Sequence, residues 1–174
     1  MPAHQIPVAV FVTGGTFDKE YDELSGTLFF KKSHVTEMLA LGRSLVSTRV
    51  ETLMMIDSLV MTDTDRELIA KKCATAKEKN IVITHGTDTM ETTARFLAPR
   101  VQHKTIILTG AMVPYKFGSS DGQFNLGSAL AYAQVLPIGV YVVMNGRFFL
   151  WNNVRKNKKA GYFEERRPLA NNTK

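Results

Sequence analysis

Short apolar runs rich in β-branched residues recur along the chain. They are residues 7–12, 50–56, 80–84, 105–109 and 138–144. Each run is continuously apolar and does not alternate with polar residues, which is typical of strands that are buried on both faces. The pattern therefore predicts a mainly parallel sheet of five strands.

Helical periodicity fills the segments between these runs, at residues 33–45, 62–79, 88–97 and 122–135. Thr62 and Asp65 have the spacing of a capping box at one helix start. Alternating strands and helices predict an α/β fold, a doubly wound, mainly parallel five-stranded sheet of flavodoxin-like or Rossmann-like type with helices on both faces. After Asn145 the pattern weakens, and we expect that tail to pack around the sheet without extending it.

Polar residues gather where the predicted strands end. The first strand ends in TGGT, the second in IDS and the third in THGTDT. In a parallel sheet these ends share one edge, and in the common strand order 2-1-3-4-5 the first and third loops face each other across a crevice. Gly14 and Gly15 let the backbone approach a ligand closely. We therefore expect Thr16 to share this crevice with Thr87 and Asp88.

Charge and sequence motifs narrow the range of partners. The chain of 174 residues has 22 Lys and Arg against 16 Asp and Glu, a formal net charge of +6. The basic residues are densest at 155–167, which favours a solvated basic surface over a nucleic-acid patch because no recognised binding motif accompanies them. Neither the G-x-G-x-x-G nor the G-x-x-x-x-G-K-[ST] phosphate fingerprint occurs. We expect no nucleic-acid partner.

Cysteine, histidine and targeting signals exclude further classes. The single cysteine, Cys73, excludes an internal disulfide, and its helical stretch predicts a small buried residue. None of the four histidines lies at ligand spacing with a carboxylate, so we expect no metal or other cofactor and a structural role for His85. The opening MPAHQ lacks the positive region of a signal peptide, and no apolar run is long enough to span a membrane. The expected location is the cytoplasm.

Stretches at the predicted strand ends resemble, in order, the motifs of bacterial-type L-asparaginases. They are TGGTF at 13–17, IDS at 56–58, THGTDTMETTA at 84–94, LTGAMVPYKFGSSDGQFNLGSAL at 108–130 and VVMNGRFFLWNNVRKN at 142–157. The resemblance spans nearly the whole chain, yet it covers only the large amino-terminal domain of that family. It implies one domain over residues 1–174, with the family's small carboxy-terminal domain absent.

The resemblance implies a catalytic set. Thr16 matches the family's nucleophile, and Tyr21 is similar to the lid tyrosine that helps to activate it. Thr87 matches the second catalytic threonine, Lys156 matches its lysine partner, and Asp88 matches the carboxylate that binds the substrate α-ammonium. Such a set suits an acyl-enzyme, because a hydroxyl nucleophile requires a base and the developing oxyanion requires donors.

The resemblance also implies a substrate-binding set. Ser58 matches the residue that holds the substrate α-carboxylate, and Asp57 precedes it in the same motif. Leu59 stands where the larger enzymes commonly have glutamine, so one polar contact is lost. Gly15 and Ala111 belong to loops whose backbone is expected to line the pocket and to donate N–H groups to the oxyanion.

Three functional hypotheses follow. The first is an amidohydrolase that converts L-asparagine, or a related small amide, into the acid and ammonia through a threonine acyl-enzyme. The second is an amino-acid-binding or regulatory protein with little turnover, because in the larger enzymes a neighbouring subunit's small domain completes each site. The third and weakest is a nucleotide or nucleic-acid binder that uses the basic tail.

The family further implies a homo-oligomer, a dimer or tetramer. The candidates for an aromatic subunit contact are Tyr115, Phe117, Phe148, Phe149 and Trp151.

Overall fold

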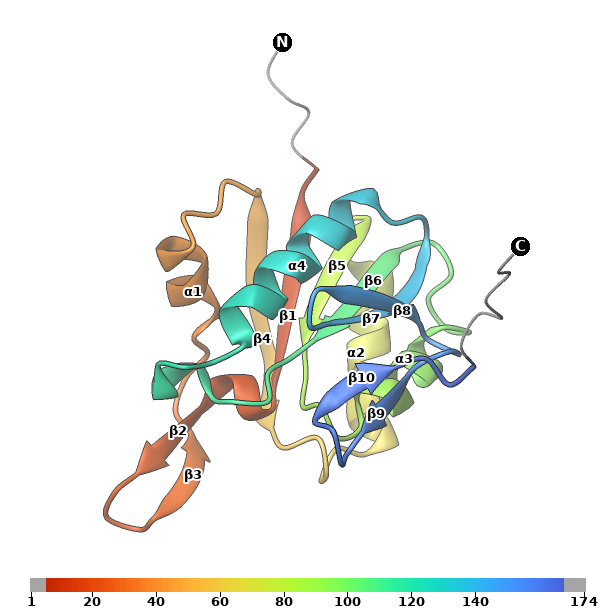
Figure 1. The fold of residues 1–174 in the computed structure, drawn as a ribbon. Coiled ribbons are helices and arrows are strands. Elements are labelled where there is room, and N and C mark those ends of the chain that lie inside the picture. The colour runs from red at the N-terminus through yellow and green to blue at the C-terminus, as the bar shows by residue number, and fades with distance from the viewer. Residues whose placement is uncertain (1–5, 168–174) are drawn as a thin grey trace, which may run out of the picture.

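A six-stranded sheet forms the centre of the molecule, and helices cover both of its faces (Figure 1). The computed structural model describes residues 6–167. In sheet order the strands are β4 (Thr48–Ile56), β1 (Val8–Gly14), β5 (Asn80–Thr84), β6 (Thr105–Thr109), β7 (Gly139–Met144) and β8 (Arg147–Leu150). The first five run parallel, which confirms the predicted fold class and the predicted order of the five apolar runs.

The edge strand β8 contradicts one prediction. We expected the chain after Asn145 to pack around the sheet without extending it, but β8 pairs antiparallel with β7. Asn145 and Gly146 both have a positive φ, 56° and 75°, which is the backbone of a two-residue hairpin turn that Asn-Gly sequences favour. In this strand only Phe149 is buried, so its sequence lacks the continuous apolar run that marks the other strands.

Alternate residues of the strands pack against helices on opposite faces of the sheet. One face is covered by α2 (Asp63–Thr75) and α3 (Met90–Leu97), and the other by α1 (Val35–Leu41) and α4 (Gly122–Val135). In β1, for example, Phe11 packs on the first face and Val10 on the second. This burial on both faces is the physical reason why the strands are continuously apolar.

Local signals account for several of the helix positions. Helix α2 begins after the predicted capping box, in which Thr62 Oγ1 accepts a hydrogen bond from the Asp65 N–H and the Asp65 carboxylate accepts one from the Thr62 N–H. Cys73 is buried in that helix, as predicted. Helix α1 is shorter than its periodic segment because the chain takes a positive φ of 50° at Arg43. No helix within residues 6–167 is both long and apolar enough to cross a membrane, and the opening MPAHQ lies outside the described residues.

Two short antiparallel hairpins lie near the carboxyl ends of the parallel strands (Figure 1). One consists of β2 (Lys19–Asp22) and β3 (Thr27–Phe30), and the other of β9 (Arg155–Asn157) and β10 (Tyr162–Glu164). Single-turn helices, η1 (Thr16–Asp18) and η2 (Tyr115–Phe117), occupy the loops after β1 and β6. These hairpins and loops carry most of the predicted site residues.

Candidate active site

The loops that follow β1, β4 and β5 touch one another through glycine backbone. Gly14 and Gly15 have φ values of 94° and 81°, which an L side chain rarely adopts. A Cβ atom at Gly15 would overlap the backbone nitrogen of Gly86, and a Cβ atom at Gly86 would overlap Ser58 Oγ. The glycines in the TGGT and HGTDT motifs therefore allow three loops to meet at one point, as the predicted strand order requires.

Three of the predicted catalytic side chains lie together. Lys156 Nζ donates hydrogen bonds to Thr87 Oγ1 at 2.7 Å and to Asp88 Oδ1 at 2.9 Å. Thr87 is buried, and the lysine side chain is mostly buried as well. The β9–β10 hairpin that carries Lys156 is anchored by Val154 and Phe163, which are both buried in the core. Residues 69 positions apart are thus brought into direct contact.

Thr16 begins the single-turn helix η1, directly after the backbone contact between Gly15 and Gly86. Its side chain is partly exposed, and within residues 6–167 no hydrogen bond occupies its hydroxyl. Gly15 donates its N–H to Ile56 O at 3.0 Å, which fixes the loop against the end of β4. Among the described residues, the Thr16 hydroxyl thus has no hydrogen-bond partner, and it lies on the loop whose Gly15 contacts Gly86 in the Thr87 loop.

Ser58 has a buried hydroxyl without a partner among the described residues. Its side chain is almost fully buried, at 1% exposure, and its Oγ atom accepts and donates no hydrogen bond there. An unpaired buried hydroxyl costs free energy unless a ligand or water satisfies it. The hydroxyl therefore suits a binding site for a polar ligand group.

Asp57 stands beside Ser58, but its two oxygens are already engaged. Oδ1 accepts from the Leu59 N–H at 2.9 Å, and Oδ2 accepts from Lys19 Nζ at 2.5 Å. Although burial favours the neutral acid, these donors hold the pKa of Asp57 below its usual value. Sequence reasoning missed Lys19, because no motif links two residues that lie 38 positions apart.

Tyr21 is not brought to the other catalytic residues. It lies on β2, where it pairs with Leu28, and it is 54% exposed. Its hydroxyl lies 4.0 Å from where a Cβ atom of Gly26 would be, near the turn of the hairpin. Ala111, in contrast, is buried two residues after the end of β6, in the core that α1 and α4 cover. The predicted roles of both residues stay predictions.

A buried acid and histidine form the root of the β2–β3 hairpin. The Asp18 carboxylate accepts the His34 backbone N–H at 2.7 Å, so the bond joins the residues on either side of the hairpin. Burial raises the pKa of Asp18 to about 6, against the lowering effects of this N–H and of the Ser33 hydroxyl. The His34 ring lies 3.2 Å from the Glu20 carboxylate on β2, and burial lowers its pKa.

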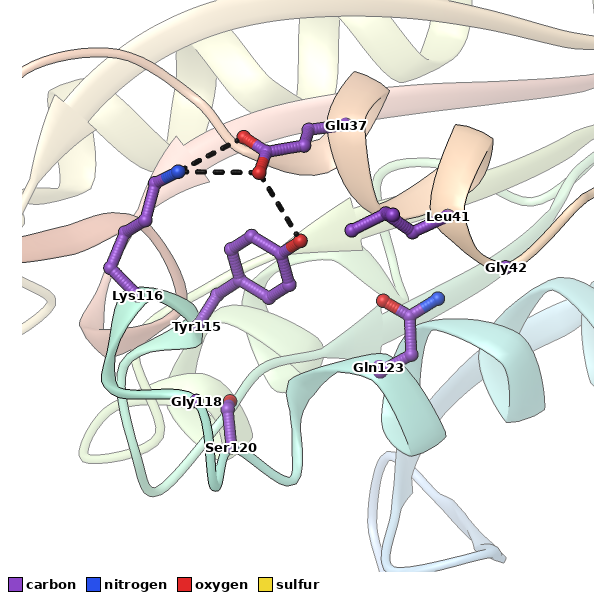
Figure 2. A pocket seen from close by; sticks show the side chains of 8 residues that line it. All are labelled: Glu37, Leu41, Gly42, Tyr115, Lys116, Gly118, Ser120 and Gln123. Atoms are coloured by element: carbon purple, nitrogen blue, oxygen red, sulfur yellow. Dashed lines mark hydrogen bonds and ion pairs between the residues drawn. The ribbon is translucent and has the colours of Figure 1, made fainter.

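A cavity of about 460 Å³ lies between α1, η2 and the start of α4 (Figure 2). Its charged and phenolic groups pair with one another: Lys116 Nζ lies 3.2 Å from both oxygens of Glu37, and the Tyr115 hydroxyl donates to the same carboxylate at 3.4 Å. None of its lining residues is a predicted site residue. We therefore assign the candidate site to the loop junction and not to this cavity.

Metal-binding groups are not clustered in the part of the chain that the structure describes. No three His, Cys, Asp or Glu side chains in residues 6–167 are grouped as metal ligands would be. The functional groups at the loop junction are hydroxyls, the ammonium groups of Lys19 and Lys156 and the carboxylates of Asp57 and Asp88, which suit nucleophilic and acid–base chemistry. The expectation that the protein needs no cofactor stays a prediction.

The family described as "Asparaginase, N-terminal" matches residues 7–164. The chain therefore belongs to the asparaginase family and corresponds to its amino-terminal domain. This finding confirms the resemblance that the strand-end motifs indicated.

Individual relatives agree with this assignment. L-asparaginase 2 of Escherichia coli is 34% identical over 148 residues, which are 79% of this chain and 42% of that protein. The solved thermostable L-asparaginase from Thermococcus kodakarensis superposes with a TM-score of 0.80 at 27% identity, covering 91% of this chain and 51% of the other. A probable cytoplasmic L-asparaginase from Campylobacter jejuni gives 0.80 at 31% identity, with 91% and 52% covered. The chain thus spans about half the length of these relatives.

Proposed function

We propose that this protein hydrolyses the side-chain amide of L-asparagine, or of a related small amide, to the acid and ammonia. The observation that carries the proposal is the bonding of Lys156 to both Thr87 and Asp88, beside the backbone contact of Gly15 with Gly86. Membership of the asparaginase family supports the reaction class.

Two subsites would hold the ends of the amino acid. The Asp88 carboxylate, which is partly exposed, binds the α-ammonium group. The unpartnered Ser58 hydroxyl binds the α-carboxylate and thereby gains the hydrogen bond that it lacks. Fixing both ends directs the side-chain carbonyl to Thr16, and such orientation supplies a large part of the rate enhancement in many enzymes.

The reaction proceeds through an ester on Thr16. Its hydroxyl oxygen attacks the amide carbon, and the hydroxyl proton passes through Thr87 and Lys156 to the leaving nitrogen. The carbon–nitrogen bond breaks, ammonia leaves, and the acyl group remains on Thr16. Water, oriented by Thr87, then attacks the ester, returns a proton to the threonine oxygen and releases the acid. Backbone N–H groups near Gly15 or Ala111 stabilise the oxyanion in both steps.

An assay of ammonia release from L-asparagine and L-glutamine tests the proposal. We expect the unmodified protein to release ammonia and Thr16→Ala to lose nearly all activity, while Thr16→Ser keeps part of it because a hydroxyl remains. Circular dichroism and thermal unfolding of the variants control for folding. Absence of ammonia from every amide tested would overturn the proposal.

A second candidate function is amino-acid binding with little turnover. The exposed position of Tyr21 on the hairpin favours it, because the expected activating hydroxyl is away from Thr16. Leu59 is also exposed and supplies no polar group to the carboxylate end. Calorimetry distinguishes the two functions: binding of L-aspartate without ammonia release from L-asparagine supports this candidate and contradicts the hydrolase.

A homo-oligomer is part of the proposal, because exposed aromatic side chains suit a subunit contact. Of the predicted contact residues, Phe117 and Phe148 are exposed. Phe149 is not available, because it is buried in the core at 3% exposure, so that expectation was wrong. Light scattering at assay concentration tests the assembly, and a monomeric mass would contradict it.

The cytoplasmic location and the absence of a nucleic-acid partner stay predictions.

A further inference from the structure

A buried arginine lies behind the site loops and takes no part in the proposed chemistry. Arg66, in α2, is only 5% exposed. Its guanidinium donates to Asp63 Oδ1 at 2.9 Å, to Thr93 Oγ1 at 3.1 Å and to Thr89 Oγ1 at 3.4 Å. Burying a charge is costly unless partners compensate for it, so this arrangement calls for a physical explanation.

The first arm of this network reaches Ser58. Thr89 Oγ1 receives the hydrogen bond from Arg66 and donates its own proton to the Ser58 carbonyl at 2.9 Å. Thr89 directly follows Asp88 in the chain. The arm therefore ties the backbone of the proposed carboxylate subsite to the backbone of the proposed ammonium subsite.

The second arm reaches the glycine that separates the loops. Thr93 Oγ1 accepts from Arg66 and has one proton left, which it donates to His85 Nε2 at 2.8 Å. His85 Nδ1 then carries the ring proton and donates it to the Gly86 carbonyl at 2.7 Å. Gly86 is the residue that packs against both Gly15 and Ser58.

The state of the His85 ring sets the directions of these hydrogen bonds. The Gly86 carbonyl can only accept, so Nδ1 carries the proton of the neutral ring, and Nε2 is then an acceptor to which Thr93 donates. Burial lowers the pKa of His85 to about 4, and the nearby Arg66 charge adds to this effect. The network is therefore complete at neutral pH, and it agrees with the structural role predicted for His85.

We propose that Arg66 is a positioning residue that sets the distance and orientation between the Ser58 and Asp88 subsites. It acts through two threonine hydroxyls, one on each arm, and so makes the site selective for amides that carry both an α-carboxylate and an α-ammonium group. The inference rests on the proposed function, because that function assigns these two subsites to the substrate.

The positioning role requires a side chain with two nitrogen donors at a fixed distance from each other, and the planar guanidinium has them. Arg66 contacts Thr89 and Thr93 with different nitrogens, Nη2 and Nε, at fixed relative geometry. A lysine ammonium is a single centre on a flexible stem and cannot reproduce both bonds. Arg66→Lys should therefore retain charge but recover only part of the function.

The test compares two amides, L-asparagine and 3-aminopropanamide, which lacks the α-carboxylate. We expect Arg66→Met to lower kcat/KM for L-asparagine at least tenfold, mainly through KM, and to leave kcat/KM for 3-aminopropanamide nearly unchanged. Arg66→Lys should give an intermediate loss for L-asparagine. Arg100→Met removes an exposed arginine at the end of α3 and serves as the matched control, with no change for either amide. Equal losses for both amides would mean a merely structural role and overturn the inference.

A second variant keeps the test decisive where Arg66→Met fails to fold. Thr89→Val preserves the shape of the side chain and removes the hydroxyl that accepts from Arg66 and donates to Ser58, so it should raise KM for L-asparagine in the same selective way. Unchanged selectivity in a folded Thr89→Val protein would also overturn the inference.

Binding of L-aspartate separates this inference from the proposed function. We expect Arg66→Met and Thr89→Val to weaken aspartate binding at least tenfold in calorimetry. If the unmodified protein binds aspartate but hydrolyses no amide, the hydrolase function fails while weaker binding by the variants still supports the positioning role. Equal aspartate affinities of the unmodified protein and the variants overturn the positioning role whatever the turnover.

Discussion

The candidate site has two sides that are built differently. On one side, Thr87, Asp88 and Lys156 are joined by hydrogen bonds of 2.7 and 2.9 Å, and the buried side chains of Val154 and Phe163 anchor the hairpin of Lys156. On the other side, Tyr21 lies on the β2–β3 hairpin, most of whose side chains are exposed. The comparison shows that both sides use a hairpin, but buried core residues anchor the hairpin of Lys156, whereas the hairpin of Tyr21 is mostly exposed.

Few contacts tie that hairpin to the rest of the protein. Lys19 reaches Asp57 at the end of β4, and Asp18 accepts the His34 N–H at the hairpin root. Glu20 faces the buried His34 ring. A segment held by few contacts has a low free energy of local opening, which is usual for lids over active sites. Substitutions in the hairpin therefore test whether its position affects the candidate site.

Removal of the lysine on the organised side should have the largest effect. Lys156→Met deletes the group that contacts both Thr87 and Asp88, and we expect kcat/KM for L-asparagine to fall about 10³-fold, in the range of lost general acid–base catalysis. Steady-state ammonia release measures this change. Lys158→Met, which removes an exposed neighbour, is the control and should be silent. A loss below tenfold in Lys156→Met would contradict the assigned role.

The hairpin root should show a pH-dependent stability. Asp18 has a pKa of about 6 in the folded protein against 3.8 for the free group, so the folded state binds more protons between these values. Its contribution therefore favours folding at low pH and is lost as the pH rises from about 4 to 6. Between about pH 4 and 6 this contribution changes the free energy of unfolding by roughly 2–3 kcal/mol, and Asp18→Asn should abolish that change.

Urea unfolding at steps of about one pH unit, from about pH 4 to about pH 7, gives the free energy of unfolding of the unmodified protein and of Asp18→Asn. The two pH profiles can then be compared. Asp22→Asn is a matched control on the hairpin itself: the Ser25 hydroxyl and Leu24 N–H lower the pKa of Asp22, so its contribution changes only below this pH range and the variant should keep the pH profile of the unmodified protein. Parallel pH profiles for Asp18→Asn and the unmodified protein would show that the Asp18 carboxyl is not perturbed.

The hydroxyl of Tyr21 distinguishes a fixed hairpin from one that closes over the substrate. If the hairpin brings this tyrosine to Thr16 during turnover, Tyr21→Phe should lower kcat about tenfold with little change in KM. Tyr162→Phe removes a similarly exposed hydroxyl from the β9–β10 hairpin and should leave kcat unchanged. An unaltered kcat in Tyr21→Phe would mean that the tyrosine side of the site contributes nothing to the chemistry.

The ion pair between Lys19 and Asp57 should have the smallest effect. Both side chains are partly exposed, and such pairs typically contribute less than about 1 kcal/mol. We expect Lys19→Met to raise KM for L-asparagine about threefold by loosening the hairpin, and added salt to reproduce part of this rise in the unmodified protein. Lys32→Met, at an exposed position after β3, controls for lost net charge. An unchanged KM in Lys19→Met would mean that the ion pair between Lys19 and Asp57 does not affect substrate binding.

The sequence predicted the sheet and the meeting of the first and third loops because their signals are local, whereas Lys156 was predicted only from the family resemblance. Continuous apolar runs mark the strands, and the glycines of TGGT and HGTDT mark the loops that meet at Gly15 and Gly86. The short edge strand β8 escaped prediction since Phe149 is its only buried residue. Its single cue was the Asn-Gly turn that precedes it.

The remaining contacts have no local signal. Lys19 and Asp57 lie 38 positions apart, and Arg66 lies 23 positions from Thr89. Such pairs are fixed only when the strands are assembled in order, so charge and polarity along the chain cannot identify them. The position of Tyr21 follows from the hairpin geometry, which depends on tertiary contacts at Asp18 and His34.

Trapping of the acyl-enzyme would show whether the Thr16 hydroxyl attacks the substrate amide. The unmodified protein is mixed with L-asparagine, quenched in acid, digested and analysed by mass spectrometry. We expect an aspartyl ester on the peptide that carries Thr16 in the unmodified protein and none in Thr16→Ala. An ester on the peptide that carries Thr87, or ammonia release without any ester, would contradict the account.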